Sequence, residues 1–407
     1  MNVAVVAEYY PRPKNPGLGI WAHRQTLAVH ALGVEPRVLV LERPLPSLHA
    51  FRSLVPRNRR PDAGPLREWA SGLRSMAREA NLDGIPVQYV RFVSPPRPTS
   101  YASWGGWAAR SLGRALDALH REWPFGLVHA HYAVPAGDAA LRWLGRHPDV
   151  PLVVSVHGGD LFYTAARNEH GRDVVSRVLG AAGAVLANSD LTRHGIEELG
   201  VPGERVHVVH PGADPVAGPP NRHQEPTLVT VANLEAHKCQ ADVIRALAAL
   251  RGRHPDLRYL MVGGGPDRPQ LTELARSLGV SDRVSFTGAL PHEQALTELA
   301  RCHIHVMPSR IDGFGVAHIE AMAAGLPTIG GAGTGAEDIA KAGEGALIVR
   351  PGDTTELVRV LDALLSDDAR REQLGEAGRR TVAANFTWGA GGKRTVEIYR
   401  SIAASHG

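Results

Sequence analysis

Two α/β halves joined by a proline-rich linker form the architecture that this sequence of 407 residues predicts. In the first half, short apolar strands alternate with helical patterns, which is typical of a parallel sheet covered on both faces by helices. Residues 215–226, PVAGPPNRHQEP, lose the apolar pattern and are rich in proline and glycine, as a linker is. The alternation then resumes. Because the chain is too long for one core, we expect two domains.

The first half is expected to contain seven strands and five helices, judged from apolar runs and helical periodicity. The segment 47–83 is expected to be irregular or partly helical. The strands are expected at residues 3–7, 37–41, 87–92, 127–130, 152–156, 184–187 and 206–209, and the helices at 20–32, 101–122, 134–146, 174–181 and 191–199.

The second half repeats the alternation and ends in a helix. Strands are expected at residues 227–231, 259–262, 284–287, 304–307, 326–329 and 346–349, and helices at 240–251, 268–278, 293–302, 316–324, 355–365, 368–384 and 393–403. Helix 316–324 is stopped by Gly325 and Pro327. The expected domains are residues 1–215, with a returning helix at 389–407, and residues 226–388.

The cysteines, the N-terminus and the lengths of the apolar runs indicate the compartment in which the protein is expected. Cys239 and Cys302 lie far apart without the spacing of a metal site, which fits a reducing, cytoplasmic compartment. The N-terminus carries Glu8 and no positive flank before its apolar run, so we expect a buried first strand and no signal peptide. No apolar run approaches the roughly 18 residues that span a membrane.

The net charge of +4 is unevenly spread. Between Ser47 and Ala80 seven arginines (52, 57, 59, 60, 67, 74 and 78) face three acids (62, 68 and 79), which gives 7 − 3 = +4. A solvated face is the commoner meaning of such a run. The alternative is peripheral contact of the Arg52–Arg78 segment with anionic lipid at the inner face of a membrane, or with an anionic acceptor. No nucleic-acid partner is expected.

The stretch 307–331, MPSRIDGFGVAHIEAMAAGLPTIGG, is the most informative part of the chain. It predicts a strand, a glycine loop and a helix, a unit that directs backbone N–H groups and a positive helix end toward an anion. Asp312 and Glu320 stand eight residues apart, too far to touch but suited to hold two ends of one long ligand. The structural alternative is that Asp312 only caps the helix.

Lys238 precedes another expected helix, at 240–251. An ammonium group there adds a point charge to the helix dipole, which is how phosphate is commonly bound. The alternative is an exposed structural lysine.

Three segments of the first half present candidate residues at the carboxyl ends of strands, where open α/β sheets bind ligands. Gly17 and Gly19 precede the first helix, followed by His23 and Arg24, although a plain turn and surface positions explain these four equally well. His131 ends the strand at 127–130. The run His157-Gly-Gly-Asp160 ends the next strand, where its glycines would leave the imidazole exposed.

These motifs resemble the retaining GT-B glycosyltransferases of family 4. The match is firm from Thr227 to Trp388 and looser before it. It covers the acidic pair followed by Ala-Met-Ala-Ala-Gly-Leu-Pro, the donor loop ending at Lys238, the His-Gly-Gly-Asp strand end and the run Phe386-Thr-Trp. The resemblance implies two Rossmann-like domains facing across a cleft, the first binding acceptor and the second the nucleotide-sugar donor, with the last helix crossing back.

Roles follow from the resemblance residue by residue. Asp312, in place of the usual glutamate, would hold the transferred sugar, Glu320 the ribose and Lys238 the pyrophosphate, while Asn233 stands where arginine is commonest. His157 would orient the sugar near its anomeric carbon, so His157, Lys238 and Asp312 are the catalytic candidates. The further donor-side candidates are Gly17, Gly19, Gly288, Leu290, Gly313, Phe314, Gly315 and Val316, and the acceptor-side candidates are His23, Arg24, His131 and Asp160.

Within family 4, the sequence looks most like the TuaC-like polysaccharide-building transferases. The features are the Asn-Pro-x-x-Gly-Ile entry to the first helix, the Val-x-Asn-Leu-x-x-x-Lys loop and the Gly-x-Gly-x-Glu-Asp run ending at Asp338. A sugar, lipid-linked or natural-product acceptor is therefore expected.

The mechanism implied is retaining transfer from a nucleoside-diphosphate sugar, such as a UDP-sugar. No cofactor is expected, and no divalent metal, because no Asp-x-Asp occurs in the sequence. The alternatives left open are a nucleotide-sugar epimerase, a phosphorylase on the same scaffold, and a catalytically silent sugar-nucleotide-binding or scaffolding subunit.

Overall fold

The computed structural model describes residues 1–12, 15, 17–44, 71, 77–215 and 221–405. The described chain forms two compact units. The first consists of Met1–Leu186, Leu199–Val206 and Val396–Gly407, and the second of Ala187–Glu198 and His207–Thr395. The greater part of the arginine-rich segment and residues 216–220 of the expected linker lie outside the described residues.

The first sheet has eight strands in the order β3-β4-β2-β1-β5-β6-β7-β8. The central pairs, from β4 through β2, β1 and β5 to β6, are parallel, whereas the edge strand β3 is antiparallel to β4. The strands are β1 (Asn2–Ala7), β2 (Glu35–Glu42), β3 (Glu79–Leu82), β4 (Ile85–Arg91), β5 (Val128–His131), β6 (Leu152–Val156), β7 (Ala184–Ala187) and β8 (Val206–Val208).

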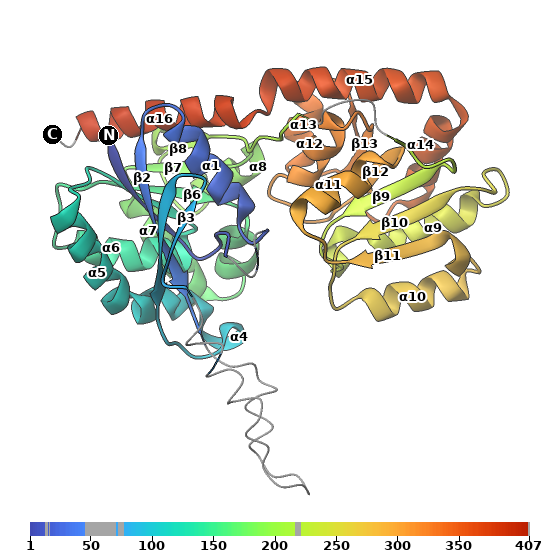
Figure 1. The fold of residues 1–407 in the computed structure, drawn as a ribbon. Helices are drawn as coiled ribbons and strands as arrows, with labels where there is room; N and C mark the ends of the chain where they lie inside the picture. The colour runs from blue at the N-terminus through green and yellow to red at the C-terminus, as the bar shows by residue number, and fades with distance from the viewer. Residues whose placement is uncertain (13–14, 16, 45–70, 72–76, 216–220, 406–407) are drawn as a thin grey trace, which may run out of the picture. The chain divides into compact units, whose positions relative to one another are not determined.

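Helices connect these parallel strands, as the alternation predicts (Figure 1). They are α1 (Ile20–His30), α4 (Arg97–Ser100), α5 (Trp104–Glu122), α6 (Asp138–Leu144), α7 (Glu169–Ala181) and α8 (Asp190–Glu197). The chain returns at its end, because α16 (Trp388–Ala404) passes from the second unit into the first at Val396. Within the first unit, the Tyr399 hydroxyl lies 2.6 Å from Nδ1 of His129 on β5 and so anchors the end of α16.

The second sheet is parallel throughout, in the order β11-β10-β9-β12-β13-β14. Its strands are β9 (Thr227–Val231), β10 (Arg258–Val262), β11 (Val284–Gly288), β12 (Ile304–Met307), β13 (Thr328–Gly331) and β14 (Ala346–Val349). Its helices are α9 (Gln240–Leu250), α10 (Arg268–Ser277), α11 (His292–Ala300), α12 (Val316–Ala323), α13 (Ala336–Ala342), α14 (Thr354–Ser366) and α15 (Asp368–Asn385).

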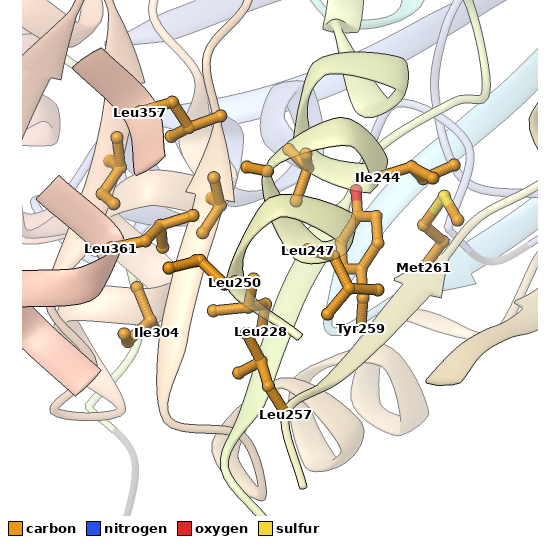
Figure 2. Packing of buried hydrophobic residues seen from close by; sticks show 14 of the residues in the cluster. Leu228, Ile244, Leu247, Leu250, Leu257, Tyr259, Met261, Ile304, Leu357 and Leu361 are labelled. Carbon is orange, nitrogen blue, oxygen red and sulfur yellow. The ribbon is translucent and has the colours of Figure 1, made fainter. Parts of the chain in front are cut away.

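Both faces of the second sheet are covered because its strands are apolar at successive positions. Leu228 packs into a core with Leu247 of α9 and Leu361 of α14 (Figure 2). Its neighbour Val229 points to the opposite face and packs with Leu299 of α11. The loops at the carboxyl ends of the strands are therefore held by two buried layers.

One segment differs from expectation. The stretch 47–83 was predicted to be irregular or partly helical. Its end forms strand β3, which pairs with β4. Asp83 and Gly84 join the two strands with φ of 52° and 87°, the left-handed pair that a two-residue hairpin needs. The dipeptide Asp-Gly signals this turn and was overlooked, so the prediction was wrong for Glu79–Leu82. Residues 47–70 and 72–76 of the stretch lie outside the described residues.

Smaller differences have local causes. Helix α6 begins at Asp138, because residues 133–137 form a separate turn that starts from Tyr132 with φ of 73°. Helix α16 begins at Trp388 instead of residue 393, and the Thr387 hydroxyl accepts the Ala390 N–H in its first turn. Strand β13 begins two residues later than expected, after Pro327, which has no N–H to donate. Among the described helices none is long and apolar enough to cross a membrane.

Candidate functional site

In the second unit, the two residues that the sequence singled out separately form one ion pair. Lys238 Nζ donates to Asp312 Oδ2 at 2.6 Å, and their side chains are 17% and 13% exposed. Lys238 ends the loop after β9, and Asp312 lies in the loop after β12, the neighbouring strand. Because both strands are parallel, their carboxyl ends bring the two loops to the same edge of the sheet.

Helix α12 begins beside this pair. Its N-cap is Gly315 in the left-handed conformation (φ 83°), and no side chain caps the helix. A Cβ on Gly315 would stand 2.6 Å from the His318 ring and 3.5 Å from Asp312 Oδ2, so glycine is the residue that fits. An uncapped helix start next to an ammonium group is an arrangement suited to an anion.

Backbone contacts hold the Lys238 loop in place. Arg310 N–H donates to His237 O at 2.8 Å, which ties the two loops together. Leu234 N–H donates to Gly264 O at 3.0 Å, and a Cβ on Gly265 would stand 2.3 Å from Leu234 O. The glycine run after β10 therefore allows that turn to pack directly on the loop that carries Lys238.

Glu320 lies further along α12 in a partly buried position. Its Oε1 is 3.5 Å from His292 Nε2 at the start of α11, and the Glu320 side chain is 14% exposed. Burial, reinforced by the nearby Asp214 carboxylate, raises the pKa of Glu320 to about 7. Near neutral pH this carboxyl group is thus poised to accept or donate a hydrogen bond.

The other donor-side candidates differ in what they present. Asn233 is exposed, whereas Leu290 packs against the apolar layer that contains Leu299. Phe314 is 1% exposed and its ring packs against Phe386 and His210, so its side chain belongs to the core. Gly288, with φ of 75°, is the last residue of the edge strand β11. Gly313 and Val316 flank the Phe314–Gly315 turn.

A buried histidine pair lies behind the α12 start and was missed in the sequence. The Thr328 hydroxyl lies 2.7 Å from Nδ1 of His305 and 2.8 Å from Nδ1 of His318. Burial, together with the Lys238 charge, lowers the pKa of His318 to about 3, so it packs under Gly315 as a neutral ring. His318 and Thr328 are ten residues apart in a stretch with the composition of an ordinary buried core, so no local sequence pattern predicts their contact.

In the first unit, the two neighbouring strands β5 and β6 bring His131 and His157 together. His131 Nδ1 lies 3.0 Å from His157 Nε2, and the two rings are nearly parallel. Burial lowers the pKa of both histidines below the usual range, so both are neutral. His131 is 1% exposed, whereas His157 remains half-buried. Of the pair, His157 is the more exposed.

Aromatic rings surround His157. Tyr132 and Trp21 lie with ring centroids 5.0 and 6.2 Å from it, and Tyr9 lies 5.3 Å from Tyr132. None of these three was predicted, because they come from separate loops and nothing in the sequence links them. Their apolar faces and polar edges are suited to an uncharged, hydroxyl-rich ligand.

Asp160, an acceptor-side candidate, is fully buried. Its Oδ1 accepts the Ala133 N–H at 2.8 Å, and its Oδ2 has no hydrogen-bond partner among the described residues. Burial raises the pKa of Asp160 to about 7. The geometry gives this residue a role in fixing the turn after β5.

The remaining first-unit candidates have distinct surroundings. A Cβ on Gly19 (φ 66°) would stand 2.1 Å from the Tyr9 carbonyl carbon, whereas Gly17 has open space. His23 is buried, with Nδ1 2.8 Å from the Tyr10 hydroxyl and Nε2 2.8 Å from Asp83 Oδ2, so both nitrogens are engaged. Arg24 is half-buried.

A charged cluster near Tyr9 was also missed. Arg97 donates to the Tyr9 hydroxyl, lies 4.0 Å from Glu8 and sits 4.1 Å above the Tyr101 ring. Burial raises the pKa of Glu8 although Arg97 opposes it. In the part of the chain that is described, no group of three or more His, Cys, Asp or Glu side chains is placed to hold a metal.

Comparisons with known proteins show which family of proteins this chain resembles. The family model Glycosyl transferases group 1 matches residues 217–381, and the model Glycosyltransferase Family 4 matches residues 16–216. D-inositol 3-phosphate glycosyltransferase 1 of Catenulispora acidiphila is 30% identical over 348 residues, which cover 78% of this chain and 81% of the relative. Alpha-D-kanosaminyltransferase of Streptomyces kanamyceticus is 29% identical over 324 residues, covering 73% and 83%.

Solved structures share the fold. Sucrose-phosphate synthase from Thermosynechococcus elongatus superposes with a TM-score of 0.75 at 20% identity, covering 100% of both chains. Anabaena HepE in complex with UDP and glucose gives 0.71 at 18% identity, covering 98% of this chain and 100% of that one. The predicted GT-B class of two Rossmann-like sheets is confirmed, whereas the TuaC-like detail stays a prediction. The chain belongs to the group 1 glycosyltransferases of family 4, which makes it a glycosyltransferase that draws on sugar-nucleotide donors.

Proposed function

We propose that the chain moves a sugar from a nucleoside-diphosphate sugar to an acceptor hydroxyl with retention at the anomeric carbon and without a metal ion. The observation that carries this proposal is the Lys238–Asp312 pair beside the uncapped start of α12. It combines a cation for the diphosphate, N–H groups for its oxygens and a carboxylate for sugar hydroxyls.

Each second-unit residue has one part in this proposal. Lys238 neutralises the leaving diphosphate, helped by the α12 N-terminus, because charge that develops on the phosphate is best stabilised by groups already in place. Asp312 accepts hydrogen bonds from the transferred sugar, and Glu320 accepts them from the ribose. Asn233 supplies no charge, so in this proposal the diphosphate depends mainly on Lys238.

Retention is proposed to proceed by attack on the same face from which the diphosphate departs. The acceptor oxygen forms its bond to the anomeric carbon as the bond to the phosphate oxygen breaks, and that phosphate oxygen takes the acceptor proton. His157 orients the sugar through its half-buried imidazole. Asp160 is a poor nucleophile for a double displacement because its carboxyl group is buried and accepts the Ala133 N–H.

Hydroxyl-bearing acceptors of the polyol, glycoconjugate or lipid-linked kind fit the relatives. The names of these relatives describe transfer involving inositol phosphate, phosphatidylinositol monomannoside and kanosamine. The Arg52–Arg78 segment is our proposed contact with an anionic membrane surface or acceptor, and vesicle sedimentation would test it.

A thermal-shift screen against UDP-, GDP- and dTDP-sugars tests the donor assignment. A true donor at 100 times its dissociation constant should add about 2.7 kcal/mol to the free energy of unfolding. Once a donor is found, the product anomer and the effect of a chelator test the finer claims. An inverted anomer would exclude the retaining mechanism, and loss of activity with chelator would exclude metal independence.

The alternatives give different results in the same assays. An epimerase would release nucleotide from the donor alone, with no acceptor present. A silent subunit would bind donor and turn none over under any acceptor tested. Transfer that requires an acceptor excludes both.

A further inference from the structure

A cavity of about 360 Å³ opens in the second unit, away from the Lys238 loop. His303 lies directly before β12, and Arg222 lies five residues before β9, so the cavity is at the amino ends of the strands. The Lys238 and Asp312 loops follow the carboxyl ends of the same two strands. The cavity and the proposed donor site are therefore at opposite edges of one sheet. Its charged and titratable lining residues are Arg222, His303, Arg371, Glu372, Glu376 and Arg379.

Three guanidinium groups converge on this cavity from segments far apart in the sequence. Arg222 donates to Gly325 O at 2.9 Å, Arg379 to Ala324 O at 3.1 Å and Arg371 to Leu364 O at 2.9 Å. The first two bonds satisfy carbonyls at the end of α12. These contacts fix the arginines in position, as binding residues need to be.

Two of the arginine side chains are largely withdrawn from solvent. The Nε atoms of Arg371 and Arg379 are buried and have no hydrogen-bond partner among the described residues. The Arg371 side chain is 11% exposed. Gly325 leaves the space that Arg379 fills, since a Cβ there would stand 2.6 Å from Arg379 Nε. Because these Nε atoms are buried, the terminal Nη atoms of the two arginines are the ones that can face the cavity.

The acidic residues nearby, Glu372, Glu376 and Asp368, are all exposed, so solvent screens their offset of this positive charge. Glu376 is 58% exposed and lies 3.9 Å from Arg379 Nη1 but 3.7 Å from Arg380, which points it toward solvent. Asp368, which contacts Arg371 at 2.6 Å, is 79% exposed. Burial and then the charges of Arg371 and Arg379 lower the pKa of Arg222. Burial and Arg222 lower the pKa of His303 to about 4, so His303 is neutral and able to accept or donate.

We propose that this cavity binds a phosphate-bearing small molecule, with the phosphate held by Arg371, Arg379 and Arg222. Guanidinium groups bind phosphate oxygens through paired, charge-assisted hydrogen bonds. The cavity volume falls in the range of pockets for small molecules, roughly 300–1,000 Å³. The inference stands on residues apart from Lys238 and Asp312 and does not depend on the proposed donor site.

Calorimetric titration of the full chain with inorganic phosphate tests this proposal, using matched pairs of variants. Arg371→Gln should weaken phosphate binding at least about tenfold, the loss of one charge-assisted hydrogen bond. Arg370→Gln, one residue away and bonded at Nη1 to Gln373, should not. Arg379→Gln and the exposed Arg380→Gln form a second pair. Because the arginines also bond helix-end carbonyls, Arg371→Lys, which keeps the charge and loses the fork, checks for unfolding and should weaken binding less than Arg371→Gln.

Lys238→Ala separates this cavity from the donor site. The inference holds if phosphate still binds to Lys238→Ala and that binding is lost in Arg371→Gln. It is overturned if Lys238→Ala alone abolishes phosphate binding, if Arg371→Gln and Arg370→Gln bind alike, or if the wild type shows no saturable binding. A second titration with glycerol phosphate identifies the source of the phosphate: tighter binding assigns a phosphorylated metabolite, and equal binding assigns free phosphate.

Discussion

The starts of helices α1 and α12 use the same backbone device in different surroundings. Each is preceded by a left-handed glycine, Gly19 with φ of 66° and Gly315 with φ of 83°, and neither has a side-chain cap. Beside α12 lies the Lys238–Asp312 ion pair. Beside α1, Trp21 packs near the neutral His157 and near Tyr9. The same uncapped N-terminus is thus presented with charge in one unit and with aromatic rings in the other.

This difference supports our proposal that the second unit binds the diphosphate and the first unit binds an uncharged sugar or acceptor. A diphosphate needs a compensating cation, because anionic oxygens are poorly stabilised by neutral rings alone. An uncharged sugar or acceptor is well served by aromatic faces and neutral imidazoles that donate or accept hydrogen bonds. We therefore expect charge-changing substitutions to act most strongly in the second unit and packing substitutions in the first.

The largest effect is expected for Lys238→Ala. Removing the only charged donor that we assign to the diphosphate should lower turnover about a hundredfold to a thousandfold, the loss typical of one preorganised donor at a developing charge. Initial rates with the donor identified by thermal shift would measure it. Lys341→Ala is the matched control, because Lys341 is 67% exposed and lies 4.0 Å from Glu337. Equal rates for both variants would show that the diphosphate binds elsewhere.

The next largest effect is a stability difference between two glycines of the α1 loop. Gly19→Ala should lower the free energy of unfolding by about 3 kcal/mol, because the new Cβ meets rigid Tyr9 backbone and φ is positive. Gly17→Ala has open space around it and should stay within about 0.5 kcal/mol of the wild type. Urea unfolding would compare them. Similar values for the two variants would mean that the approach of Gly19 to Tyr9 is not tight in solution.

Short-range signals in the sequence were enough for part of this site. The glycine loop before α12, the lysine before α9 and the His-Gly-Gly-Asp strand end each carry their information within a few residues. Apart from β3, the strands of both sheets were recognisable for the same reason. The contact between Lys238 and Asp312 was not predicted, because it depends on which strands are neighbours in the second sheet.

Contacts between distant residues could not be read from the sequence. Arg97 meets Glu8 and Tyr9 only because the first sheet brings β1 close to the segment after β4. His318 and His305 share Thr328 through strand pairing of β12 with β13. Residues of such ordinary types carry no spacing signal, so their roles follow from topology. The Asp83-Gly84 turn differs, since its signal was present and was overlooked.

A third expected effect concerns the pH dependence of stability in the second unit. The pKa of Glu320 is raised from 4.5 to about 7 in the folded state, so the folded protein binds the proton more tightly than the unfolded chain. That contribution is fully present below pH 4.5 and is lost as the pH rises through about 7. Glu320→Gln removes this loss, so its stability relative to the wild type should rise by about 3 kcal/mol between about pH 4 and pH 8.

Urea unfolding of both proteins across this range measures the gain. The difference between the two curves isolates Glu320 from Asp160, whose pKa is shifted in the same direction. Parallel curves would show that Glu320 is better solvated than its position beside His292 and Asp214 implies.

The smallest expected effect distinguishes a structural histidine of the first unit from the one proposed to face ligand. His129 has both nitrogens engaged, with Tyr399 at 2.6 Å and with the Ser155 hydroxyl at 2.8 Å. Tyr399→Phe should therefore cost about 1 kcal/mol of stability, the net value of a buried hydrogen bond. Nucleotide affinity should stay unchanged, because we assign the nucleotide to Lys238 and Glu320 of the second unit. Unchanged stability would mean that packing of the ring alone holds α16 to β5, whereas weakened nucleotide binding would show that the anchoring of α16 reaches the donor site.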